Sequence, residues 1–80
     1  MLKYTVVLEW DEEWHGWCVS VPALPGCVTQ AKTKKQAIER ITEAISGYIA
    51  TLRDLGREIP TEHNPPVEVE QVEIPEGKAA

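Results

Sequence analysis

The segment Val19–Thr29, with its two prolines and one glycine, constrains the fold more than any other part of the sequence. Pro25 and Gly26 suit the central positions of a type II turn, because proline presets the first φ and glycine accepts the positive second φ. Pro22 has no N–H group and should therefore lie where a strand ends. These residues predict a β-hairpin with a shaped loop, which needs a partner strand before it and a covering element after it.

Alternation of apolar and polar side chains predicts the remaining strands of a small sheet. Residues 2–10 alternate with a period of two, as in a strand with one buried face. An acidic turn that ends at Gly16 follows, and residues 17–21 and 27–31 form the second and third strands. Because the connections are short, we expect these three strands to be antiparallel neighbours in sequence order.

The pattern then changes to the spacing of a helix. Thr33 and Gln36 match a capping box, in which the threonine oxygen accepts the backbone N–H of Gln36 and the glutamine side chain reaches back. Apolar residues recur every three or four positions as far as Leu55, which predicts one amphipathic helix covering a face of the sheet. Gly56 is the expected glycine after the last helical turn.

The chain after the helix predicts a return to the sheet. Residues 57–66 contain three prolines and indicate an extended connection. Residues 67–74 predict a fourth strand whose three glutamates suit an exposed edge. Its apolar side chains form two pairs in opposite phases, Val67 with Val69 and Val72 with Ile74, which a β-bulge would reconcile.

Size and charge limit the classes of function. A chain of 80 residues buries a small share of its surface, so we expect a homo-oligomer, either a dimer or a tetramer. The net charge of −5 comes from 13 acidic and 8 basic residues, without a basic stripe, so we expect a basic partner and no direct binding of nucleic acid. No apolar run approaches the roughly 20 residues of a membrane span, so we expect a cytoplasmic protein that makes no contact with membranes.

The residues described so far resemble a known family. The hairpin segment Val19–Gln30, the helix start at Thr33 and Gln36, and Gly56 followed by Ile59 and Pro60 are similar to HicB antitoxins. The resemblance implies an α+β, partial ribonuclease-H-like fold of the order β-β-β-α-β. In that fold a four-stranded mixed sheet has strand order 3-2-1-4, with the last strand parallel to the first and one long helix on one face.

The resemblance also implies a function. HicB proteins bind and neutralise HicA, a small basic toxin that cleaves messenger RNA, so we expect a HicA-like toxin as the partner. Many members carry a C-terminal segment that binds operator DNA, whereas only six residues follow Ile74 here. We expect a single HicB-like domain over residues 1–74, a flexible tail over residues 75–80 and no DNA-binding segment.

The candidate partner-binding surface is the first turn of the sheet. It combines large aromatic and acidic side chains within a few positions, Trp10, Asp11, Glu12, Glu13 and Trp14. Aromatic residues are enriched at the centres of protein interfaces, and carboxylates suit a basic partner. We therefore expect this turn to contact the toxin.

Catalysis and metal binding are the alternatives for the remaining polar residues. An active ribonuclease-H-like enzyme needs a carboxylate in the middle of its first strand to help hold two metal ions, and residues 5–8 contain none. A metal site could be assembled on paper from the two histidines and the two cysteines, His15, Cys18, Cys27 and His63, but their spacing does not select it. We expect no catalytic residues, no metal and no cofactor. The alternative functions are a stand-alone oligomeric binding or regulatory protein and, more remotely, a degenerate nuclease.

Overall fold

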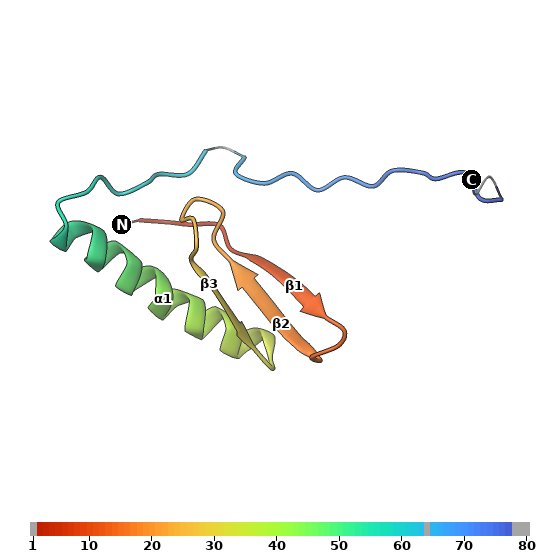
Figure 1. Ribbon diagram of the computed structural model, residues 1–80, viewed down its shortest axis with the longest axis horizontal. Coiled ribbons are helices and arrows are strands. Elements are labelled where there is room, and N and C mark those ends of the chain that lie inside the picture. Colours follow the sequence, from red (N-terminus) through yellow and green to blue (C-terminus); the bar gives the residue numbers. More distant parts are fainter. Residues whose placement is uncertain (1, 64, 78–80) are drawn as a thin grey trace.

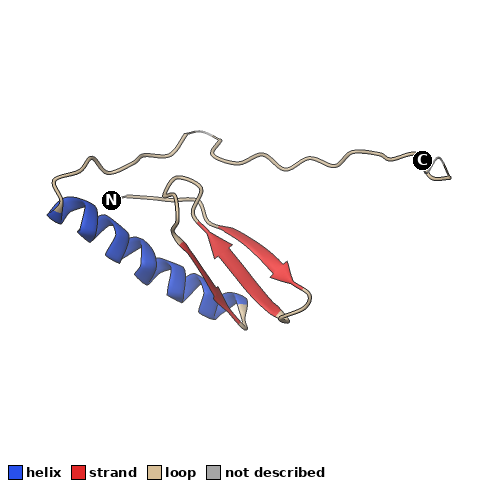
Figure 2. Ribbon diagram, viewed as in Figure 1, coloured by secondary structure: helices blue, strands red, loops and turns tan. Residues whose placement is uncertain are grey.

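The computed structural model describes residues 2–63 and 65–77 and shows an α+β fold. Three strands, β1 (Val7–Asp11), β2 (Gly16–Ser20) and β3 (Val28–Ala31), precede one long helix, α1 (Lys34–Asp54) (Figure 1). The strands form an antiparallel sheet in the order β1-β2-β3, and α1 lies along one face of it (Figure 2). The meander and the single long helix confirm the expectation from the sequence.

The ladder between β1 and β2 is shorter than the alternation in the sequence predicts. Val7 pairs with Ser20, and the pairing ends there. The next residue of β2, Val21, donates its backbone N–H to Cys27 O at 3.1 Å, so that the chain turns into the loop at Pro22 instead of continuing beside β1. Residues 2–6 have a strand-like pattern but no strand opposite them, because β2 has already ended.

Two successive turns shape the loop between β2 and β3. Leu24 N donates to Val21 O, and Cys27 N donates to Leu24 O, each at 3.0 Å. Gly26 has a φ of +81°, as the second central position of a type II turn requires. The side chain of Leu24 is completely buried, and the helix holds the loop through Tyr48 Oη, which donates to Pro25 O at 2.9 Å.

The hydrophobic core lies between α1 and the strands β2 and β3. Its buried members are Val19, Val21, Leu24, Cys27, Ala31, Ala37, Ile41 and Ile49. Leu8 pairs with Val19 and so shares the face that α1 covers. Trp10 shares that face too but remains 47% exposed, because α1 packs on β2 and β3 rather than on β1.

Capping interactions at both ends define α1. Thr33 Oγ1 accepts the backbone N–H of Gln36 at 3.1 Å. At the other end Gly56 has a φ of +67° and donates to Arg53 O, while Arg57 donates to Leu52 O. This pair of hydrogen bonds is a Schellman motif, which requires a residue that accepts positive φ at Gly56.

The expected fourth strand and the order 3-2-1-4 are not seen in the described residues. After α1 the chain passes the N-terminal segment, and residues 67–74 then run as extended chain away from the sheet (Figure 1). Three of their four apolar side chains, those of Val69, Val72 and Ile74, therefore lie in solvent, with Val69 87% exposed, whereas Val67 is half-buried. Of the expected tail, Pro75 continues this extended path, Glu76 and Gly77 form a turn, and residues 78–80 lie outside the described part, as do Met1 and Asn64.

We predict that Gly26→Ala lowers the free energy of unfolding by about 1–2 kcal/mol, because a side chain at positive φ is strained. The matched control is Gly47→Ala. A Cβ at either glycine meets no atom within 4 Å, but Gly47 lies in the middle of α1. That change should raise the free energy of unfolding by up to ~1 kcal/mol. Urea unfolding followed by tryptophan fluorescence at one protein concentration measures both, and equal midpoints for the two variants would contradict the turn assignment.

Candidate functional site

The turn between β1 and β2 is built around the carboxylate of Asp11. One of its oxygens, Oδ1, accepts the backbone N–H groups of Glu13 and Trp14, both at 3.0 Å. The backbone oxygen of Asp11 accepts from His15 N at 2.8 Å, and His15 adopts a φ of +56°. Asp11 therefore stabilises the turn through Oδ1, and its other carboxylate oxygen makes neither of these two hydrogen bonds.

Trp14 connects this turn to the start of α1. Its ring packs against the backbone of Gly16, where an added Cβ would overlap the ring. Lys32 Nζ lies 4.0 Å from the ring centroid and also donates to Trp14 O. The cation and the ring attract each other through the negative face of the indole. Trp14 is half-buried, and these contacts give it a structural role at the end of the sheet.

Trp10 is the exposed aromatic residue of the turn. Its ring meets the ring of Trp17 edge-on at 5.4 Å between centroids and that of His15 at 6.3 Å. Its Nε1 donates to Glu12 Oε2 at 2.8 Å, which holds both side chains at the surface. With one edge packed and the other open, Trp10 has the geometry of an interface anchor whose rotamer is already ordered.

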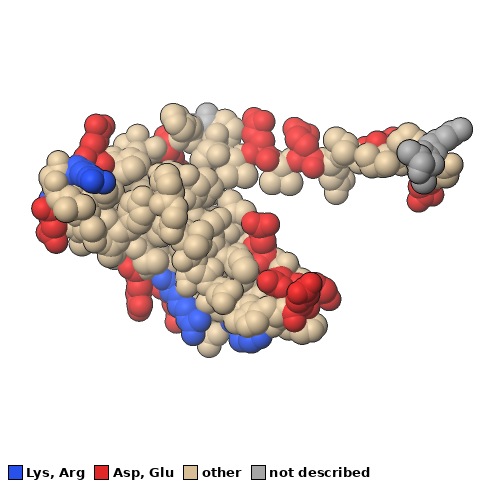
Figure 3. Space-filling model, in the orientation of Figure 1, with Lys and Arg blue, Asp and Glu red and all other residues tan. Residues whose placement is uncertain are grey.

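A shallow hollow with several acidic residues lies at the end of β1 next to the turn. It is lined by Glu9, Trp10, Asp11, Glu12, Glu13 and Cys18. Carboxylates gather at this end of the molecule in the space-filling view (Figure 3). The structure thus brings four of the five predicted residues to one surface and places Trp14 behind it.

Two members of the hollow, Glu9 and Cys18, were missed by the sequence interpretation. They are directly opposite each other in the ladder between β1 and β2, on the face of the sheet that α1 does not cover. The signal that could have found them is the hairpin register, which makes Glu9 the strand neighbour of the acidic turn.

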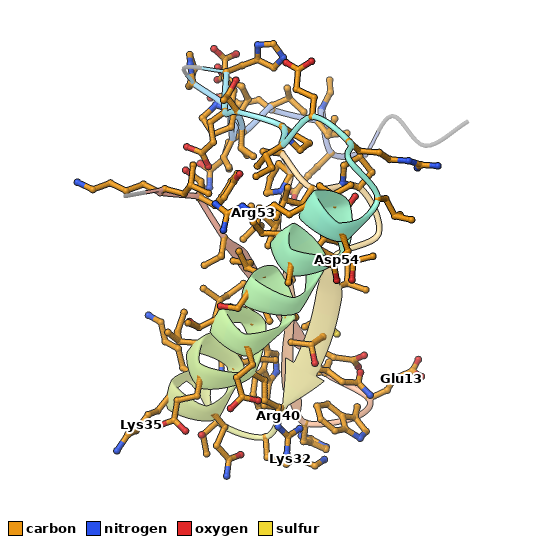
Figure 4. All side chains as sticks on the ribbon, turned by 90° about the vertical axis from the view of Figure 1, so that its left-hand side faces the viewer. Glu13, Lys32, Lys35, Arg40, Arg53 and Asp54 are labelled. Atoms are coloured by element: carbon orange, nitrogen blue, oxygen red, sulfur yellow. The ribbon has the colours of Figure 1, made fainter. Side chains whose placement is uncertain are left out.

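Basic side chains lie beside the acidic hollow. Lys32, just before α1, and Lys35 and Arg40, in its first turns, lie at the same end of the molecule as Glu13 (Figure 4). Arg40 donates to Gln30 O at 2.8 Å. Arg53 and Asp54 lie at the opposite end of the helix, so that Asp54 is a carboxylate remote from the hollow (Figure 4).

The structure does not assemble the residues considered for catalysis or metal binding. Residues 5–8 present no carboxylate, and the exposed glutamates Glu68 and Glu70 lie on the segment that leaves the sheet. Within residues 2–63 and 65–77, no three His, Cys, Asp or Glu side chains are grouped so that they could hold a metal ion. Both cysteines are free thiols, and burial raises the pKa of the Cys27 thiol. The only long helix of the described residues, α1, is too polar to cross a bilayer.

The fold and this surface define a small α+β protein with an acidic and aromatic surface at one end of its sheet. A family model described as "HicB_like antitoxin of bacterial toxin-antitoxin system" matches residues 4–76. The chain therefore belongs to the HicB-like antitoxin family. Membership supports an antitoxin role and implies a toxin as partner.

Proteins from distant organisms are similar to this chain. A UPF0150 protein of Thermoplasma acidophilum is 48% identical over 62 residues, which cover 78% of this chain and 88% of the relative. A UPF0150 protein of Archaeoglobus fulgidus is 41% identical over 54 residues, covering 68% and 77%. One from Synechocystis is 43% identical over 62 residues, covering 75% of each. No solved structure matches the chain.

We predict that Asp11→Ala lowers the free energy of unfolding by about 1–2 kcal/mol, because two turn N–H groups lose a charged acceptor. Asp11→Asn is the control, since its amide oxygen accepts the same hydrogen bonds and should recover at least half of the loss. Urea unfolding at pH 7 compares them. Equal losses for both variants would mean that charge, rather than the turn hydrogen bonds, makes Asp11 stabilising.

The two thiols should differ in reactivity. The thiolate is the reactive form, and Cys27 is only 4% exposed with a raised pKa, whereas Cys18 is half-buried at the hollow. In the folded protein at pH 8, we expect iodoacetamide to modify Cys18 at least about tenfold faster than Cys27, with the difference lost in urea. Mass spectrometry of the digested protein reads out each site, and equal folded-state rates would contradict the burial of Cys27.

Proposed function

We propose that this protein is an antitoxin that binds a small basic toxin of the HicA type, which cleaves messenger RNA, and that it performs no catalysis itself. The observation that carries the proposal is the acidic hollow at the end of β1, which Trp10 also lines, in a member of the HicB-like antitoxin family. Carboxylates on a rigid turn complement the basic surface with which such a toxin holds RNA. Binding there would block access of the RNA by occupying the surface and neutralising its charge.

The residues of the hollow divide the work of binding between them. Trp10 supplies apolar contact area, and its packing against Trp17 reduces the conformational entropy that binding costs. Glu9, Glu12 and Glu13 are exposed and draw in a basic partner over a distance of about 10 Å at moderate salt. The net charge of −5 acts in the same direction and disfavours direct binding of nucleic acid.

The proposal includes the complete family fold. Residues 1–74 supply one domain fold, in which a strand formed by residues 67–74 lies beside a β1 strand and parallel to it, in a partial ribonuclease-H-like sheet with strand order 3-2-1-4. The support is the strand-like alternation of residues 67–74 and the position of β1 at the sheet edge. The protein assembles as a homo-oligomer, which the exposed apolar side chains of the same segment support.

A stand-alone oligomeric binding or regulatory protein is the second candidate. The exposed apolar segment 67–74 favours self-association, which such a protein would need even without a toxin. Purification together with any short basic protein that is encoded beside this one separates the two functions. A stoichiometric complex that stops RNA cleavage supports the antitoxin, whereas an oligomer that ignores the neighbouring protein supports the second candidate.

We predict that Trp10→Ala and Glu13→Lys each weaken toxin binding at least about tenfold, or ~1.4 kcal/mol. The control is Asp54→Lys, which makes the same charge change at the far end of α1 and should alter the dissociation constant less than about threefold (Figure 4). Calorimetric titration of the toxin into each variant measures this, with circular dichroism to check folding. Undiminished affinity in both turn variants would rule out the hollow as the toxin site.

A further inference from the structure

Residues 67–74 carry apolar side chains into solvent in the pattern of a strand without a sheet. Val69, Val72 and Ile74 are 87%, 79% and 75% exposed, and each directly follows a glutamate or glutamine in the sequence. The segment also extends the molecule, whose radius of gyration is 16.4 Å. A compact chain of this length would have a radius of about 12 Å. Burying three such aliphatic side chains would be favourable, and the isolated chain lacks this stabilisation because they are in contact with water.

The outer edge of β1 is an unpaired sheet edge that could accept this strand. No described strand pairs with this edge, so its backbone groups are available for a new ladder. On the helix side, Val6 and Leu8 are only partly buried, because α1 covers β2 and β3. A groove of about 720 Å³ opens between the N-terminal segment and α1, lined among others by Tyr4, Ile45 and Ile49. This side of β1 thus offers both a backbone edge and an apolar floor.

The segment is poorly placed to pair with the β1 edge of its own copy. Tyr4 Oη donates to Pro60 O at 2.7 Å, and Thr5 donates from its backbone N–H to the Glu62 carboxylate. If the chain continued from this anchor in parallel register, Glu68 would already lie opposite Asp11, where β1 ends. Val69 and all later apolar residues would then lie beyond the end of β1, with no strand beside them. Pro65 and Pro66 have no N–H to donate to such a ladder, and residues 67–74 run away from the sheet instead (Figure 1).

We propose that residues 67–74 of one copy occupy the fourth-strand position beside β1 of a second copy, and that the exchange is reciprocal. The partner is a second copy of this chain, and the product is a closed, twofold-symmetric dimer. Backbone hydrogen bonds to β1 bind the added strand. Of its two apolar pairs, which point to opposite faces of the sheet, one lies over the groove and the other lies beside Val7. The new outer edge carries Glu68, Glu70 and Glu73, which oppose addition of another strand and so stop growth at the dimer.

This inference rests on the fourth strand proposed above but does not depend on a toxin. Its first test therefore uses the full-length protein alone. Chain labelled with ¹⁵N and chain labelled with ¹³C are unfolded, mixed and refolded together. Nuclear Overhauser effects are then recorded between β1 amides on ¹⁵N and valine or isoleucine methyl groups of residues 67–74 on ¹³C. Because the two labels are on different molecules, such signals arise only between copies.

We expect these signals in the mixed sample. Their absence there, together with their presence in a sample whose chains carry both labels, would place the strand on its own copy and overturn the exchange. Their absence from both samples would show that residues 67–74 pair with no β1 and would overturn it equally. Neither result decides whether a toxin binds, which the co-purification tests separately.

A pair of point variants supplies the second test. Val72→Lys should raise the dissociation constant of the dimer at least about tenfold, because a charged side chain replaces a buried methyl pair at the new interface. Leu55→Lys is the control, since Leu55 is 61% exposed at the other end of the molecule and should leave the dimer intact. Light scattering over a dilution series measures both. A monomeric wild-type chain, or equal dissociation constants for the two variants, would overturn the proposal.

Discussion

The complete burial of Leu24 is the contact on which the rest of the structure depends. Leu24 belongs to a loop, yet it is as buried as any core residue of a strand or of α1. Two turn hydrogen bonds hold its backbone, and the loop is tied to the helix through Tyr48. In a core of eight buried side chains, one leucine worth about 2 kcal/mol of transfer free energy is a large share. Its position sets the spacing of β2 and β3, and α1 packs over those two strands.

One consequence of this arrangement is that α1 leaves β1 largely without a covering element. The helix is directed over the loop and the two strands that the loop connects, so the helix-facing row of β1 has only partial cover. Trp10, at the end of that row, is left with an exposed edge, and Glu12 holds it by a hydrogen bond. The exposed edge of Trp10 and the unpaired edge of β1 therefore have a common origin in the geometry of the core.

The parts of the fold that local chemistry decides could be predicted from the sequence. The Pro25–Gly26 turn and the ends of α1 depend on residues a few positions apart, and the alternation of the meander is visible in short windows. The start of β1 and the fate of residues 67–74 could not be predicted in the same way, because pairing requires a distant partner. Pro22 removes the partner of residues 2–6, and the anchor between Thr5 and Glu62 sets residues 67–74 beyond the sheet.

The candidate site shows the same division. Its aromatic and acidic composition could be predicted from one short segment, but the roles within it could not. The carboxylate of Asp11 holds two backbone N–H groups and the ring of Trp14 covers Gly16, and neither role is visible without the shape of the turn. Glu9 and Cys18 join the hollow only because the hairpin register places them together.

Strand exchange and toxin binding would meet on β1. A parallel strand from a second copy would end at the same end of the sheet as the hollow, so its last glutamate, Glu73, would add negative charge next to Asp11. The same strand would order the edge of β1 that carries Trp10. An assembled dimer would then bind a basic partner more tightly than a single copy does. By thermodynamic linkage the partner would stabilise the dimer by the same factor, so toxin and second copy would act as mutual effectors through one five-residue strand.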